Sequence, residues 1–114
     1  MNNYAIQFIG KEVDIKIDRL INSRHPDHGF LYKINYGFVP DTIAPDGEEI
    51  DAYLLMVGKP VKSYKGKCIA VIHRLEEDDD KLVVVPSDSI NISDEKILEL
   101  TDFQEKFFTI KIIR

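Results

Sequence analysis

The segment that most constrains the fold of this chain is residues 50–57, Ile-Asp-Ala-Tyr-Leu-Leu-Met-Val. It is apolar at almost every position, so a strand formed here would have to bury both of its faces. Gly58-Lys59-Pro60 follows at once and would end such a strand. We therefore expect a central strand of a barrel or of a sheet covered on both sides.

Shorter segments elsewhere also have strand character. Alternation of apolar and polar residues, or a high content of β-branched and aromatic residues, predicts strands at residues 4–8, 13–17, 30–32, 67–75 and 81–85. The last two flank an acidic turn and should form an antiparallel hairpin. Residues 35–45 are interrupted by Gly37, Pro40 and Pro45, and are expected to be irregular or bent.

One helix is predicted near the C-terminus. Residues 91–94 offer N-cap candidates, and apolar side chains then follow at helical spacing: Ile97, Leu100, Phe103 and Phe107. Residues 109–113 could be a last strand or a helix end. Several short strands and one late helix in 114 residues predict a single domain spanning 1–114. Its fold class should be mainly β (α+β), a small β-barrel with the helix packed beside it.

Composition and charge exclude several classes of function. The net charge is −5, but nine of the 20 acids fall in residues 46–51 and 76–80, and the remainder carries +4. The sequence lacks the cluster of Lys and Arg residues that is typical of a nucleic-acid-binding surface. Neither a signal peptide nor an apolar run of ~18 residues is found, so we expect a cytoplasmic protein without a membrane partner. The lone Cys68 lies in a predicted strand and is interpreted as a core residue.

The first acidic run is Asp46-Gly47-Glu48-Glu49-Ile50-Asp51. Carboxylates here pass from a turn into the apolar strand, where Asp51 would be costly to bury without a cation or strong donors. Oxygen ligands suit Mg²⁺, which takes only one or two carboxylates directly, so a cluster of acids could hold several ions. An acidic, solvated turn is the alternative, and the spacing by itself favours that turn.

The second acidic run, residues 76–80, ends beside Lys81. If this end is extended, Glu77, Asp79 and Lys81 share one face, which would put an ammonium beside two carboxylates. An exposed hairpin tip is the alternative. Tyr32 and Tyr36 could donate to a phosphate, although core positions are commoner for tyrosine.

Taken together, these motifs resemble the soluble family I inorganic pyrophosphatases. Family members carry a tyrosine followed by Asn-Tyr-Gly-Tyr or Asn-Tyr-Gly-Phe, as this chain does from Tyr32 to Phe38. Their acidic signature, usually Asp-Gly-Asp-Pro-x-Asp, corresponds to residues 46–51. An acidic hairpin then leads into Lys81. The three motifs occur in the family's order between about residues 30 and 86, half of the chain.

The resemblance implies an OB-like five-stranded β-barrel and hydrolysis of pyrophosphate with Mg²⁺ as the cofactor. It also implies a homo-oligomer. By position, the implied metal ligands are Asp46, Asp51, Glu76, Glu77 and Asp79. Lys81 and Tyr36 match active-site residues, Glu48 matches the acid that accepts a proton from the attacking water, and Arg24 is placed near the family's phosphate-binding arginine.

Several positions depart from the family pattern. Glu48 replaces an aspartate, which moves the carboxylate by one methylene, and Glu49 replaces a proline. Phe107-Phe108 stands where the family has a phosphate-binding Tyr-Lys pair, and the hairpin is about two residues shorter. Two alternatives therefore stay open: a hydrolase of another, organic diphosphate, and a non-catalytic OB-like module that binds metal or phosphate.

Overall fold

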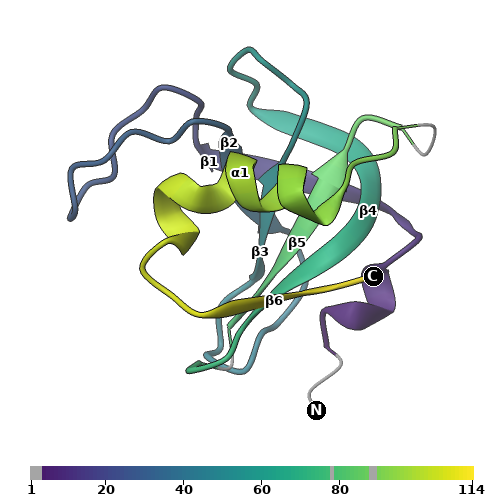
Figure 1. Ribbon diagram of the computed structural model, residues 1–114. Coiled ribbons are helices and arrows are strands. Elements are labelled where there is room, and N and C mark those ends of the chain that lie inside the picture. Colours follow the sequence, from purple (N-terminus) through teal and green to yellow (C-terminus); the bar gives the residue numbers. More distant parts are fainter. Residues whose placement is uncertain (1–3, 78, 88–89) are drawn as a thin grey trace.

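Five strands close into a barrel in the computed structural model, which describes residues 4–77, 79–87 and 90–114 (Figure 1). The barrel strands are β1 (Glu12–Arg19), β2 (Asn35–Val39), β3 (Ile50–Leu54), β4 (Ser63–Arg74) and β5 (Asp80–Val85). Their order is β1-β2-β3-β5-β4, and β4 pairs back onto β1 to close the ring. The predicted mainly β, OB-like five-stranded barrel is confirmed.

The pairing of β3 with β5 brings two distant segments together. These two strands run parallel, whereas β4 and β5 form the predicted antiparallel hairpin. β4 is long enough to pair with β1 along its first half and with β6 (Ile110–Ile113) along its last residues. The tail therefore forms a strand, one of the two outcomes that the sequence left open.

Apolar side chains form two layers, one on each face of the central strands. The layer inside the barrel contains Ile15, Ala52, Leu54, Val71, Leu82 and Val84. The outer layer contains Tyr53, Ile72, Val83 and Val85, together with Ile97 and Phe103 of the helix. Successive residues of β3 and β5 thus point into different cores, which explains why residues 50–57 are apolar on both faces. Burying a side chain of this size stabilises the fold by about 1.5–3 kcal/mol.

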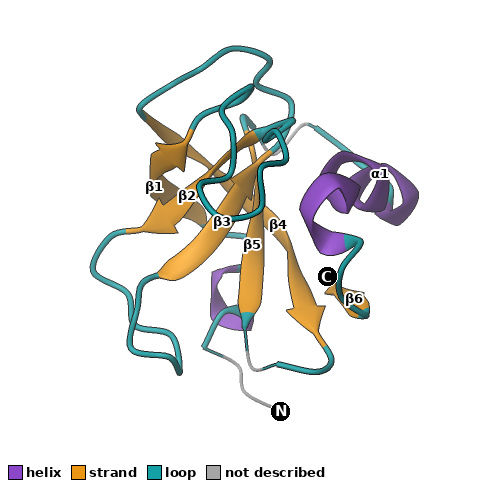
Figure 2. Cartoon of the chain, turned by 90° about the vertical axis from the view of Figure 1, so that its left-hand side faces the viewer, coloured by secondary structure: helices purple, strands orange, loops and turns teal. Residues whose placement is uncertain are grey.

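The helix α1 (Asp94–Glu105) packs over the outer layer, beside β4, β5 and β6 (Figure 2). Ser93 is the N-cap and its hydroxyl accepts a hydrogen bond from the backbone N–H of Lys96. The helix ends at Glu105, so Phe107 lies beyond it although it follows the helical spacing. No helix in the described part of the chain is long and apolar enough to cross a membrane.

Three predictions of local structure were wrong. Residues 35–39 form β2 rather than an irregular segment, and Gly37 is what allows it. A Cβ on Gly37 would lie 1.8 Å from the carbonyl oxygen of Lys16 on β1, so only glycine lets the two strands approach. The glycine marks a close approach within a strand rather than a break.

The other errors concern residues 4–8 and 30–32. Residues 4–8 contain the 3₁₀ helix η1 (Ile6–Phe8), and residues 30–32 contribute only an isolated bridge between Leu31 and Arg24. In the described part of the chain, the five barrel strands pair in a ring and the last residues of β4 pair with β6, and neither segment joins the sheet as a strand.

Candidate active site

A buried lysine joins two carboxylates at one end of the outer layer. Lys81 Nζ donates to Asp51 Oδ2 at 2.6 Å and to both carboxylate oxygens of Asp79 at 3.0 Å. Asp51 lies opposite Lys81 in the β3–β5 pair, and Asp79 is two residues before Lys81 on the same face. The lysine side chain is 3% exposed, while those of Asp51 and Asp79 are 35% and 28% exposed. This group is called the Lys81 triad below.

Two members of the Lys81 triad, Lys81 and Asp51, line a cavity of about 740 Å³. Charged side chains from the barrel strands line one part of this cavity, and aromatic and polar side chains from the 20–34 loop, β2 and the end of α1 with the residues after it line the rest. The lining residues are Asp18, Arg19, His25, His28, Phe30, Tyr32, Tyr36, Asp51, Arg74, Lys81, Gln104, Phe107 and Phe108. Charged groups and rings therefore face the same space.

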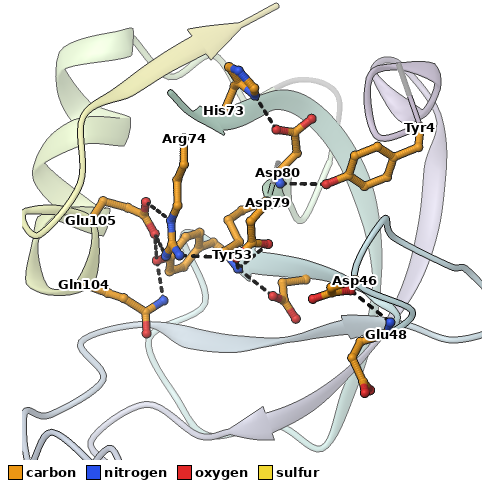
Figure 3. A network of polar contacts seen from close by, with 12 residues as sticks. Tyr4, Asp46, Glu48, Tyr53, His73, Arg74, Asp79, Asp80, Gln104 and Glu105 are labelled. Carbon is orange, nitrogen blue, oxygen red and sulfur yellow. Dashed lines mark hydrogen bonds and ion pairs between the residues drawn. The ribbon is translucent and has the colours of Figure 1, made fainter. Parts of the chain in front are cut away.

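A second buried ion pair, between Arg74 and Glu105, lies next to Asp79 of the triad (Figure 3). Arg74 Nε and Nη2 donate to the two carboxylate oxygens of Glu105 at 3.0 and 2.8 Å, and Nη1 reaches Asp79 Oδ2 at 3.3 Å. Burial lowers the pKa of Arg74, but hydrogen bonds and the charge of Glu105 outweigh it, and the net shift is upward. The guanidinium also stacks over the ring of Phe108 at 3.7 Å. Asp79 is thus held by two cations.

Hydrogen bonds extend this network under the helix to the tyrosines. Tyr53 donates to Glu105 Oε2 at 2.6 Å and accepts from Gln104 Nε2 at 2.6 Å, and Tyr32 donates to Gln104 Oε1 at 3.0 Å. Burial, followed by the charge of Glu105, raises the pKa of Tyr53 well above its ordinary value. No buried side-chain nitrogen or oxygen among the described residues lacks a partner. A fully satisfied network of this kind fixes the positions of its members.

Tyr36 lies between the triad and the loop. Lys81 Nζ is 5.8 Å from the centre of its ring. Burial, and after it the negative charge of Asp51, raises the pKa of the Tyr36 hydroxyl well above 10. The hydroxyl therefore remains a neutral hydrogen-bond donor at physiological pH.

Asp46 and Glu48, which the sequence assigned to the site, lie on the exposed loop before β3. Their contact is local, because the Glu48 backbone N–H donates to Asp46 Oδ1 at 2.9 Å. In Figure 3 a dashed line joins Asp46 to Glu48, and none joins either of them to the contacts around Asp79. Neither side chain lines the cavity.

Glu76, Glu77 and Arg24 also lie outside the cavity lining. Glu76 Oε1 accepts a hydrogen bond from the backbone N–H of Thr109 at 2.9 Å, and Glu77 is exposed in the turn after β4. Arg24 donates to the carbonyl of Gly29 within its own loop. Of the nine predicted site residues, the structure thus brings together Asp51, Asp79, Lys81 and Tyr36. Asp78, in the same acidic run, lies outside the described residues.

Two arginines at the site were missed from the sequence. Arg19 lies across from Tyr36 in the β1–β2 pair and lines the cavity, and Arg74 lies two residues after Ile72 of the outer layer. Period-2 alternation extended to the last residue of β4 would have placed Arg74 on the face of Ile72. It would not have found Arg19, because the register of β1 shifts between Ile17, which packs inside the barrel, and Arg19.

The Lys81 triad can be tested against the needs of a magnesium ion. Mg²⁺ usually binds one or two carboxylates and completes its shell with water and phosphate oxygens. The partly exposed carboxylates of Asp51 and Asp79 meet this requirement for one ion. In the described part of the chain, no three His, Cys, Asp or Glu side chains gather closely enough to hold a metal together. The residues fit one ion bound with its waters and the substrate.

Comparison with known proteins gives a consistent match. The inorganic pyrophosphatase family model matches residues 8–112. The inorganic pyrophosphatase of Rickettsia prowazekii is 31% identical over 109 residues, which cover 92% of this chain and 62% of that protein. The Pseudomonas aeruginosa enzyme is 32% identical over 96 residues, covering 80% and 54%. The chain thus spans little more than half the length of these relatives.

Solved structures show the same fold. The inorganic pyrophosphatase of Ehrlichia chaffeensis superimposes with a TM-score of 0.70 at 19% identity, covering 90% of this chain and 85% of that one. The Helicobacter pylori protein gives a TM-score of 0.64 at 20% identity, covering 89% and 81%. At this level of identity, the likeness concerns the arrangement of strands and helix.

Proposed function

The chain belongs to the inorganic pyrophosphatase family, and we propose that it hydrolyses inorganic pyrophosphate to two phosphates with Mg²⁺ in the cytoplasm. The observation that carries this proposal is the Lys81 triad at the rim of the cavity. Water would add to one phosphorus as the bridging P–O bond breaks, and the second phosphate would leave. Both products carry negative charge, so the protein must supply positive charge and donors where that charge develops.

Each of three side chains in the cavity has a separate role in binding the phosphoryl groups. Lys81 is fixed by Asp51 and Asp79, so its ammonium needs no reorganisation to meet a phosphoryl oxygen. Tyr36 supplies a neutral hydroxyl, because its raised pKa keeps the proton in place. Arg19 lines the cavity and Arg24 does not, so we assign the binding of a phosphate to Arg19.

Asp51 and Asp79 are the residues that would hold Mg²⁺. A bound ion lowers the pKa of a coordinated water and neutralises phosphate charge. Glu48 remains our candidate for the proton acceptor, because it occupies the position of the family's catalytic acid. Its exposed place on the loop before β3 means that the loop would have to move toward the cavity when substrate binds.

The test is the release of phosphate from pyrophosphate, measured at high enzyme concentration with Mg²⁺ and with EDTA. We expect turnover that requires Mg²⁺. Lys81→Met should lower kcat by about 10²–10³-fold, the usual cost of removing one preorganised donor. The matched control is Lys65→Met, because Lys65 lies on the exposed side of β4 with only 4.0 Å contacts to Glu12 and Asp14. It should keep the wild-type rate.

Circular dichroism should show that both variants keep the fold, since the carboxylates left behind by Lys81→Met are partly exposed. Absence of turnover with Mg²⁺ in the wild-type chain would refute the proposal. So would equal rates for Lys81→Met and Lys65→Met.

A further inference from the structure

An unbroken series of aromatic rings runs along the cavity from the Lys81 triad to the protein surface. Lys81 Nζ is 5.8 Å from the ring centre of Tyr36. Ring centres then follow at 5.6 Å from Tyr36 to Tyr32, at 5.6 Å from Tyr32 to Phe30, and at 6.1 Å from Phe30 to Phe107. All four rings line the same cavity as Lys81. They are called the aromatic wall below.

The outer end of the aromatic wall is open to solvent. Phe107 is 62% exposed, whereas Tyr32 is buried within the core under the helix. His25 packs against Phe30 with ring centres 4.8 Å apart, which widens the flat surface on the loop side. Exposed aromatic surface inside a cavity is typical of a site that binds an apolar or planar group.

Pyrophosphate alone would leave this wall unused. A cavity of about 740 Å³ falls within the range that is usual for organic ligands, about 300–1,000 Å³. The net positive charge at the Lys81 end of the cavity is also small, because two of its cations are already ion-paired. Lys81 pairs with Asp51 and Asp79, and Arg74 pairs with Glu105. A diphosphate group by itself therefore gains less from these two cations, and contact of an attached organic group with the aromatic wall would add binding energy.

We propose that the cavity takes an organic diphosphate whose organic group is a planar ring, of which a nucleoside diphosphate is the common form. The diphosphate lies at Arg19 and the Lys81 triad, and the ring stacks on the wall at Phe30 and Phe107. Stacking on an aromatic side chain tolerates different bases, because every base presents a flat π face. If the proposed hydrolase acts on this ligand, attack of water on the terminal phosphorus would break the bridging P–O bond and give a nucleoside monophosphate and inorganic phosphate, with no further reactant.

This inference rests on the proposed function only in that both use the same phosphoryl end of the cavity. The experiment is calorimetric titration of the full chain with Mg²⁺ and three probes: ADP, methyl diphosphate and pyrophosphate. ADP and methyl diphosphate are both monoesters of diphosphoric acid and carry the same diphosphate group, and only ADP has an aromatic ring. We expect ADP to bind about tenfold more tightly than methyl diphosphate, in line with the energy of one base stacked on an aromatic ring.

Phe107→Ala should remove most of this tenfold preference. Phe107 is exposed beyond α1, so its loss should not unfold the protein. Leu98→Ala is the matched control, because Leu98 is a large exposed apolar side chain of α1 that does not line the cavity. It should keep the preference. Phe30→Ala gives a second, independent variant on the wall.

The outcomes separate the two proposals. Equal affinities for ADP and methyl diphosphate, together with hydrolysis of pyrophosphate, overturn this inference and leave the proposed function standing. A preference for ADP that survives both Phe107→Ala and Phe30→Ala also overturns it. Ring-dependent binding of ADP without any hydrolysis supports the inference and overturns the hydrolase. Failure to bind any of the three probes overturns both.

Discussion

Replacing Glu105 with glutamine should reveal how far the fold depends on the ion pair behind the active site. Arg74 and Glu105 are both buried, with side chains 8% and 2% exposed, and they share two hydrogen bonds at 2.8 and 3.0 Å. Glutamine presents an N–H₂ group to the guanidinium in place of one oxygen. It therefore leaves a buried positive charge without its full counter-charge.

The expected cost follows from that geometry. Breaking one partner of a buried pair destabilises a protein by about 3–5 kcal/mol. A domain of this size is stable by only about 5–15 kcal/mol, and about 4 °C of melting temperature is lost per kcal/mol. Glu105→Gln should therefore lower Tm by about 12–20 °C. Asp79 still contacts Arg74 at 3.3 Å, which favours the lower part of this range.

Urea denaturation followed by circular dichroism measures the effect, with Glu99→Gln as the matched control. Glu99 lies on the same helix, 70% exposed, and meets Lys96 at 3.5 Å. That exposed pair should contribute less than about 1 kcal/mol. The double variant Arg74→Met/Glu105→Leu should cost less than Glu105→Gln alone, because it leaves no unpaired charge. A loss below about 1 kcal/mol for Glu105→Gln would refute the reasoning.

Two further predictions concern the barrel itself. Gly37→Ala should cost more than about 4 kcal/mol, because the new Cβ would meet the carbonyl oxygen of Lys16 at 1.8 Å, whereas Gly58→Ala, with open space around it, should cost under about 1 kcal/mol. Equal urea midpoints for the two variants would contradict the β1–β2 register. Burial raises the pKa of the Cys68 thiol from 9.0 to about 11. The folded state keeps the thiol proton to a higher pH than the unfolded state, so stability is full below about pH 9 and has fallen by about 2 kcal/mol at pH 11. Cys68→Ala should flatten this decline in denaturation curves taken between pH 8 and 11, and an unchanged slope would show that the thiol is not its cause.

Sequence patterns recovered the elements whose burial is periodic. Alternation in β1 and the apolar run of β3 were readable because a closed barrel with a covering helix buries them in a regular way. Gly37 was misread because glycine marks both breaks and close approaches, and only the position of Lys16 on the neighbouring strand distinguishes the two.

For the site, the sequence by itself determined that acids, a lysine and tyrosines of the pyrophosphatase pattern are present, including Asp51, Asp79, Lys81 and Tyr36. Which of them converge was decided by the parallel pairing of β3 with β5, which sets Lys81 opposite Asp51 although 30 residues separate them. The same packing joined Arg74 to Glu105 across 31 residues and set Phe107 on the rim of the cavity. Spacing along a chain specifies neighbours on one element, whereas neighbours on different elements depend on register and packing, which no single segment encodes.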